Sequence, residues 1–202
     1  MKSTFASDLE KEQKLHKLLD SCYRKGLKNY SFKRIKGHRQ QMIGIDLHFT
    51  SNRSGQVFSI DEKAQLDYLN ENLPTFAFEL QYEKTGILKQ GWLFNPHKKT
   101  DFYSLITSIY CDEPDIFTSC KITFVNRRKL IRFLSEKRLS EESLKKYLNA
   151  SPNHRGKLEI DQLNARNQGY LYFSRQNKAE KPVNLILRLD FLIANGVARR
   201  FM

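Results

Sequence analysis

Residues 42–63 read Met-Ile-Gly-Ile-Asp-Leu-His-Phe-Thr-Ser-Asn-Arg-Ser-Gly-Gln-Val-Phe-Ser-Ile-Asp-Glu-Lys, and this stretch decides the interpretation of the chain. Two segments within it, 42–49 and 56–63, alternate apolar and polar residues, as strands with one buried face do. The polar run 50–55 ends in Gly55 and suits a hairpin loop. The stretch therefore predicts two neighbouring antiparallel strands.

Acidic and basic side chains gather on one face of this predicted hairpin. Because strand side chains alternate between faces, Asp46 points with His48, and Asp61 and Lys63 point with Ser59. If the apolar faces align, two carboxylates and one ammonium meet at one end of the hairpin. Carboxylate oxygens suit Mg²⁺, which usually takes one or two of them and keeps several waters. A lysine beside such an ion can orient a nucleophile or offset phosphate charge.

The composition points to a polyanionic partner. The chain carries 35 Lys and Arg against 22 Asp and Glu, a formal net charge of +13. This balance favours nucleic acid first and an anionic membrane surface second. The alternative is a basic protein kept soluble by its charge.

A length of 202 residues fits one domain, or one domain with a modest extension. No stretch approaches the roughly 20 apolar residues of a membrane span, and the N-terminus lacks the apolar core of a signal peptide. The three cysteines, Cys22, Cys111 and Cys120, have neither metal-ligand nor disulfide-framework spacing. We therefore expect a cytoplasmic protein with no membrane partner.

The remaining pattern predicts an α/β (α+β) fold. Ser7 and Glu10 form a capping box for a first helix that ends near Gly26. A core over residues 1–125 would carry a helical and β extension over 126–202, packed on the same domain. Further strands are expected over 30–35, 75–82, 91–94, 102–111, 121–125, 169–175 and 183–188, and further helices over 126–135, 140–149 and from 189 onward.

The order helix, strand, strand with Asp46, then strand with Asp61-Glu62-Lys63 resembles the PD-(D/E)xK nuclease superfamily, in particular its phage and bacterial members. The resemblance covers roughly residues 7–125 and implies a restriction-endonuclease-like core, which is a central mixed β-sheet flanked by helices. The chain departs from the motif in having no proline before Asp46. Asp61 and Glu62 both precede the lysine closely, and face alternation favours Asp61.

The resemblance implies a Mg²⁺-dependent endodeoxyribonuclease, with Mn²⁺ as the alternative ion. Asp46 and Asp61 would hold the metal, and the backbone carbonyl of Glu62 would add a ligand. Many members also place a glutamate on the preceding helix, where Glu12 is the candidate here. The other interpretation of Glu12 is an edge residue that reaches solvent.

The same resemblance assigns catalytic roles beyond the metal ligands. Lys63 would position or activate the attacking water, and Gln65 matches, loosely, a glutamine that several members carry after the lysine. Five basic residues near the hairpin are candidates for binding the DNA backbone, or else form a solvated basic face: Lys33, Arg34, Lys36, Arg39 and Arg53.

Two other functions compete with a nuclease. One is a non-catalytic nucleic-acid-binding or adaptor protein on the same scaffold, and the other is an interaction module whose positive charge meets an acidic protein. A homodimer would supply two sites for the two strands of a duplex, although no stretch of the sequence identifies its interface.

Overall fold

The computed structural model describes residues 5–113, 116–174 and 180–202. By their internal contacts these residues form two compact units. The first unit comprises residues up to 73, 97–127 and 198–202, and the second comprises 74–96 and 128–197. Each unit has its own sheet, so each is described by itself.

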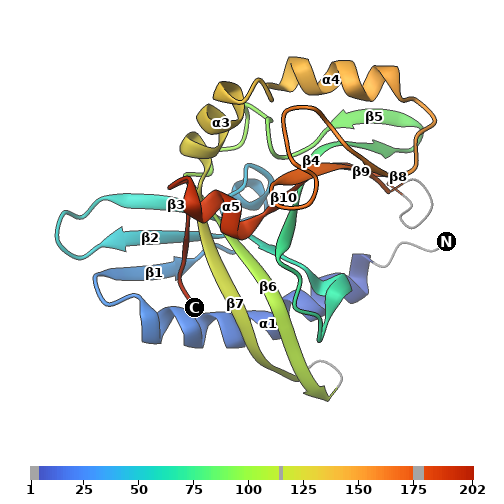
Figure 1. The fold of residues 1–202 in the computed structure, drawn as a ribbon. Helices are drawn as coiled ribbons and strands as arrows, with labels where there is room; N and C mark the ends of the chain where they lie inside the picture. The colour runs from blue at the N-terminus through green and yellow to red at the C-terminus, as the bar shows by residue number, and fades with distance from the viewer. Residues whose placement is uncertain (1–4, 114–115, 175–179) are drawn as a thin grey trace. The chain divides into compact units, whose positions relative to one another are not determined.

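The first unit is a mixed sheet of six strands with a long helix, α1 (Phe5–Gly26), packed along it (Figure 1). The strand order is β1-β2-β3-β6-β7-β11. Only β3 and β6 run parallel, and the other neighbours are antiparallel. The strands are β1 (Tyr30–Arg34), β2 (Leu47–Ser51), β3 (Val57–Ala64), β6 (Phe102–Glu113), β7 (Ile116–Asn126) and β11 (Ala198–Arg200).

The core of the first unit lies between α1 and one face of this sheet. Leu15, Leu19 and Tyr23 come from the helix, and Leu47 and Ile60 come from β2 and β3. Their spacing on α1 is the predicted apolar stripe, and burying it is what holds the helix to the sheet. The residues that alternate with Leu47 and Ile60 therefore face away from α1.

The predicted hairpin is confirmed, because β2 and β3 pair antiparallel in the register Leu47↔Ile60 to Thr50↔Val57. The predicted central mixed sheet flanked by helices is also confirmed. The structure therefore belongs to the mixed α+β class, as the sequence pattern indicates.

Two predicted boundaries are wrong. The strand expected from residue 42 begins only at Leu47, because residues 38–42 form a short helix, α2 (His38–Met42), and Gly44 turns the chain at φ +78°. Asp46 therefore lies just before β2 and not within it. At the N-terminus, α1 already includes Phe5, so Ser7 lies inside the helix and is not its N-cap.

The second unit is an antiparallel sheet of five strands, in the order β5-β4-β10-β9-β8, with three helices. A tight turn through Thr85 and Gly86, both at positive φ, joins β4 to β5. The strand expected over 91–94 is wrong, since this turn places β5 at residues 87–90. The elements are β4 (Thr75–Lys84), β5 (Ile87–Gln90), β8 (Gly156–Leu158), β9 (Gly169–Phe173), β10 (Val183–Arg188), α3 (Arg127–Glu136), α4 (Glu141–Ala150) and α5 (Leu189–Ala194).

The contacts divide the chain differently from the predicted boundary at residue 125. Strand β4 pairs with β10 over Phe76↔Leu187 and its neighbours, so residues 74–96 join the C-terminal elements. Strand β11 returns to β7 in the first unit. Local sequence patterns carry no information on such long-range pairing.

No helix among the described residues is both long and apolar enough to cross a membrane. All three cysteines are free thiols.

Candidate functional site

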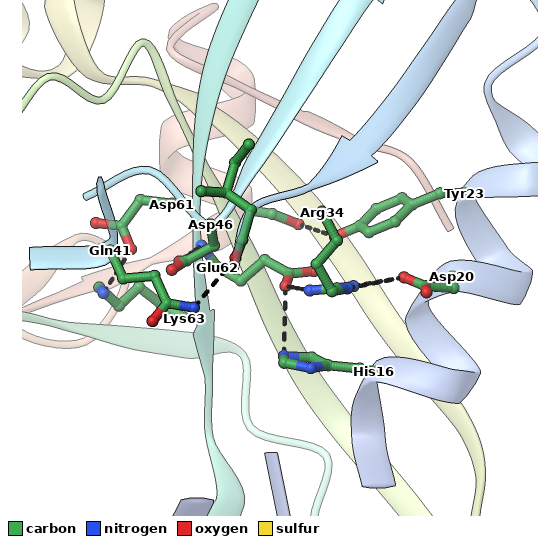
Figure 2. Close-up of polar contacts among 11 residues, drawn as sticks. His16, Asp20, Tyr23, Arg34, Gln41, Asp46, Asp61, Glu62 and Lys63 are labelled. Carbon is green, nitrogen blue, oxygen red and sulfur yellow. Dashed lines mark hydrogen bonds and ion pairs between the residues drawn. The ribbon is translucent and has the colours of Figure 1, made fainter. Parts of the chain in front are cut away.

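Asp46 sits where the ladder between β2 and β3 ends. Its backbone N–H donates to Ile60 O at 2.8 Å, and its Oδ2 accepts from the backbone N–H of Glu62 at 2.8 Å. The side chain therefore takes the place that the next backbone carbonyl would occupy if β2 continued. This contact fixes one oxygen of Asp46 against the end of β3 (Figure 2).

Asp61 and Lys63 project from β3 on the face opposite α1. The Lys63 Nζ donates to Asp61 Oδ1 at 2.6 Å. Asp61 is buried to 1% exposure, whereas the Lys63 side chain keeps 28%. The second oxygen of Asp61, Oδ2, is buried and has no hydrogen-bond partner among the described residues. A buried carboxylate oxygen without a donor is costly, so this atom marks an incomplete site.

The electrostatics show that Asp46, Asp61 and Lys63 lie together. Burial, followed by the negative charge of Asp61, raises the pKa of Asp46 to about 7, although Lys63 and the Glu62 N–H oppose the shift. Burial lowers the pKa of Lys63, but attraction to Asp61 and then to Asp46 outweighs it and leaves that pKa raised. Two carboxylates this close compete for one proton, and a cation would relieve them both.

Gly44 and Thr100 form the wall beside Asp61. A Cβ at Gly44 would lie 2.4 Å from Thr100 Oγ1 and 3.0 Å from Asp61 Oδ2, so no side chain fits there. The Thr100 hydroxyl donates to Gly44 O at 2.8 Å and holds the turn in place. Glycine at this position avoids a clash next to the unpartnered oxygen.

The donor set fits a hard divalent cation. Among the described residues no group of three or more His, Cys, Asp or Glu side chains is placed to hold a metal, so a cation here would rely on Asp46 and Asp61. The N–H and carbonyl of one strand residue point to the same side of the strand, so the Glu62 carbonyl faces the Asp46 side as well. Two carboxylates, one carbonyl and several waters match the preferences of Mg²⁺.

The Glu62 side chain points to the opposite face, toward α1. Its Oε1 accepts from the Tyr23 hydroxyl at 2.8 Å, and its Oε2 forms an ion pair with Arg34. Arg34 also pairs with Asp20, and His16 Nε2 lies 3.8 Å from Glu62 Oε2 (Figure 2). The predicted ligand role of Glu62 is therefore left to its backbone carbonyl alone.

The other two predicted site residues are Glu12 and Gln65. Glu12 is exposed on α1, and its charge is one of those that raise the pKa of Lys63. Gln65 follows β3, where its backbone N–H donates to Ile106 O at 3.0 Å and its side chain is half-buried. The structure brings Asp46, Asp61 and Lys63 together and leaves Glu12 and Gln65 at the margin.

The basic residues predicted to bind the DNA backbone differ in their surroundings. The guanidinium of Arg34 is engaged by Glu62 and Asp20 inside the unit. The other predicted residues are exposed: Lys33, Lys36, Arg39 and Arg53.

The sequence interpretation missed the cluster formed by Tyr23, Asp20 and His16 beneath Glu62. These residues recur at positions i, i+4 and i+7 of α1, a spacing that places them on one helix face. Polar residues on an otherwise apolar stripe were the available signal, because a buried polar group needs a partner. Nothing local indicated that the partner would be Glu62.

No protein-family model, no curated protein and no solved structure matches this chain.

Proposed function

We propose that the protein is a metal-dependent nuclease that hydrolyses phosphodiester bonds of DNA, with Asp46 and Asp61 binding Mg²⁺ and Lys63 assisting the attacking water. The observation that carries the proposal is the unpartnered, buried Asp61 Oδ2 beside a second carboxylate whose pKa is raised to about 7. A structural ion pair would leave neither feature, since both would weaken the fold without a compensating contact.

Bound Mg²⁺ would supply Lewis-acid chemistry by drawing charge from the scissile phosphate. The protein's part is to hold the donors in place. Asp46 is fixed by the Glu62 N–H and Asp61 by Lys63, so the two carboxylates need little reorganisation when an ion binds. Preorganised groups of this kind lower the cost of reaching the transition state.

Lys63 is suited to orient a water rather than to deprotonate it. Its raised pKa keeps it an ammonium at neutral pH, and an ammonium has three N–H donors and no acceptor. One donor contacts Asp61 Oδ1. The ammonium can therefore steer the attacking oxygen toward phosphorus and offset the charge that develops on the phosphate.

The topology of the first unit supports a restriction-endonuclease-like core. Helix α1 is followed by the antiparallel strands β1, β2 and β3, and β3 is parallel to β6. This is a mixed sheet flanked by a helix, as the resemblance of the sequence implies. The net charge of +13 supports a DNA partner, because phosphates are the polyanion that the site chemistry would act on.

The test is cleavage of plain duplex, single-stranded and branched DNA with Mg²⁺, with Mn²⁺ and with a chelator. We expect cleavage of at least one substrate with either ion, none with the chelator, and none in Asp61→Asn. The matched control is Asp112→Asn, the same change at an exposed acid on β6. Cleavage that survives in Asp61→Asn, or no cleavage of any substrate, would contradict the proposal.

One observation favours a second candidate, a non-catalytic DNA-binding protein on the same scaffold. Lys63 already neutralises Asp61 through a 2.6 Å contact, so an ammonium could serve where a nuclease uses a cation. In that case DNA binding would be salt-sensitive, independent of Mg²⁺ and unchanged in Asp61→Asn. Measuring DNA binding as well as cleavage, with the same substrates and metal conditions, distinguishes the two candidates.

A further inference from the structure

We propose that the Glu62 side chain, with Tyr23 and Arg34, is a positioning network that sets the orientation of the Asp46 carboxylate. The inference rests on the proposed function, in which Asp46 binds Mg²⁺, and it assigns a role to polar residues on the α1 side of β3. Their side chains are positioning groups, because they act on the proposed metal site only through the backbone of Glu62.

The network is closed and buried. Both oxygens of Glu62 are engaged, Oε1 by the Tyr23 hydroxyl at 2.8 Å and Oε2 by Arg34. The Tyr23 hydroxyl also lies 2.8 Å from Ser104 Oγ on β6, so the network ties α1, β1, β3 and β6 together. The Glu62 side chain keeps only 8% of its exposure.

Such a network is an expensive way to hold a helix on a sheet. The ring of Tyr23 packs edge-on against Phe32 and Phe49, with centroids 5.5 and 5.3 Å away, so its surroundings are aromatic. Burying a carboxylate and a guanidinium there costs desolvation that their attraction barely repays, and apolar residues of similar size often stabilise as well or better. What apolar residues do not provide is one fixed geometry for Glu62.

The backbone of Glu62 is where that geometry matters. The ladder between β2 and β3 ends at Leu47↔Ile60, so on the β2 side the Glu62 N–H meets the Asp46 carboxylate instead of a backbone carbonyl. On the other side, Glu62 is paired with Ser104 of β6. The side-chain network anchors the same residue from a third direction, and it thereby fixes the donor that orients Asp46.

The test compares Tyr23→Phe and Glu62→Gln with Ile109→Val, a change in the same helix–sheet core that leaves the network intact. Tyr23→Phe loses the hydroxyl contacts with Glu62 and Ser104, and Ile109→Val loses one buried methyl group, so each costs on the order of 1 kcal/mol. Glu62→Gln also breaks the ion pair with Arg34 and costs more. The readouts are the Kd of Mn²⁺ by titration calorimetry, the Mg²⁺ concentration for half-maximal cleavage, and hydrogen exchange at the Glu62 amide.

We expect both network variants to bind Mn²⁺ about 10-fold more weakly, within the range of partners that orient a ligand. Cleavage by Tyr23→Phe at saturating Mg²⁺ should be nearly unchanged, the Glu62 amide should exchange faster in both network variants, and Ile109→Val should match the wild type in all three measurements. If both network variants stay within twofold of the wild type in the Kd of Mn²⁺ and in amide exchange, the inference is overturned but the proposed function is not. A wild-type protein that binds no Mn²⁺ would overturn the proposed function, while amide exchange would still decide whether the network positions Glu62.

Discussion

The two faces of β3 carry similar residues in opposite states. On the α1 side, the carboxylate of Glu62 has a donor on each oxygen, from Tyr23 and Arg34. On the other side, Asp61 shares one oxygen with Lys63 and leaves the second without a partner among the described residues. A closed network is complete as folded, whereas an open one has room for a further cation. The difference separates residues that hold the site from residues that would do its chemistry.

The largest expected effect comes from neutralising the open face at Asp46. Asp46→Asn keeps an acceptor for the Glu62 N–H but removes the charge, so we expect cleavage to fall about 1,000-fold, as when a positioned electrostatic group is lost. The metal-free protein should be no less stable, because a carboxylate with a raised pKa is removed. The cleavage rate tests the first expectation, and the thermal unfolding temperature of the metal-free protein tests the second. If Asp46→Asn were less stable than the wild type but cleaved DNA at the wild-type rate when folded, Asp46 would belong to the residues that hold the fold and not to those that act on DNA.

Removing the ammonium should separate binding from chemistry. We expect Lys63→Met to lower cleavage about 100-fold, at the low end of the loss caused by removing one positioned electrostatic donor. It should bind Mn²⁺ at least as tightly as the wild type, because both carboxylates lose their internal cation. Lys28→Met, an exposed change, is the control for the loss of one charge. Loss of Mn²⁺ binding in Lys63→Met would argue against its role on water.

The closed face should respond through stability. Arg34→Met leaves the Glu62 carboxylate buried without its counter-ion, so we expect the free energy of unfolding to fall by about 2 kcal/mol. This is less than a fully buried pair would lose, because the Arg34 side chain retains 19% of its exposure. Urea unfolding measures the change, and Arg24→Met on the exposed side of α1 should shift it by less than about 0.5 kcal/mol. Equal losses of unfolding free energy in Arg34→Met and Arg24→Met would show that the ion pair of Arg34 with Glu62 does not stabilise the fold.

The pH dependence of metal-free stability should report the open face. The pKa of Asp46 is raised to about 7 in the folded protein, so the proton binds more tightly there than in the unfolded chain. The resulting stability is present in acid and is lost as the pH rises from about 4 toward about 7. Burial lowers the pKa of His16, so the contribution of His16 to stability changes with pH in the opposite direction. Subtracting the unfolding temperature of Asp46→Asn from that of the wild type at each pH isolates the contribution of Asp46. A difference that does not vary with pH would contradict the coupling.

The smallest effects should come from the exposed basic residues. Lys36→Ala and Arg39→Ala should each weaken DNA binding slightly and reduce the slope of log K against log salt by about 1. Arg34→Met should leave that slope unchanged, because its guanidinium is engaged within the unit. Binding titrations at several salt concentrations test this. A slope change in Arg34→Met but not in Lys36→Ala would mean that the two have been assigned the wrong way round.

Local pattern predicted what depends on local chemistry. The alternation in residues 56–63 placed Asp61 and Lys63 opposite Ile60, and the helical stripe placed Leu15, Leu19 and Tyr23 in the core, as the structure has them. The convergence of Asp46 on Asp61 followed from aligning two apolar faces, and it survives although Asp46 lies before the strand. A period of two is enough to assign faces without exact boundaries.

What could not be predicted depends on long-range contacts. The ion pair of Arg34 with Glu62 joins residues on different strands, and no spacing within either strand encodes it. The pairing of β4 with β10, which assigns residues 74–96 to the second unit, likewise links distant segments. The sequence did not predict the turn at Gly44, because a glycine between two isoleucines fits the pattern of a strand.

The central claim is that Asp46 and Asp61 together hold a divalent cation. The most direct measurement is anomalous diffraction from a crystal of the protein soaked in Mn²⁺, with an Asp61→Asn crystal treated in the same way. We predict a single strong peak within coordination distance of one oxygen from each carboxylate, and no peak in the variant. A wild-type map with no peak there, even after a soak at high Mn²⁺, would contradict the account.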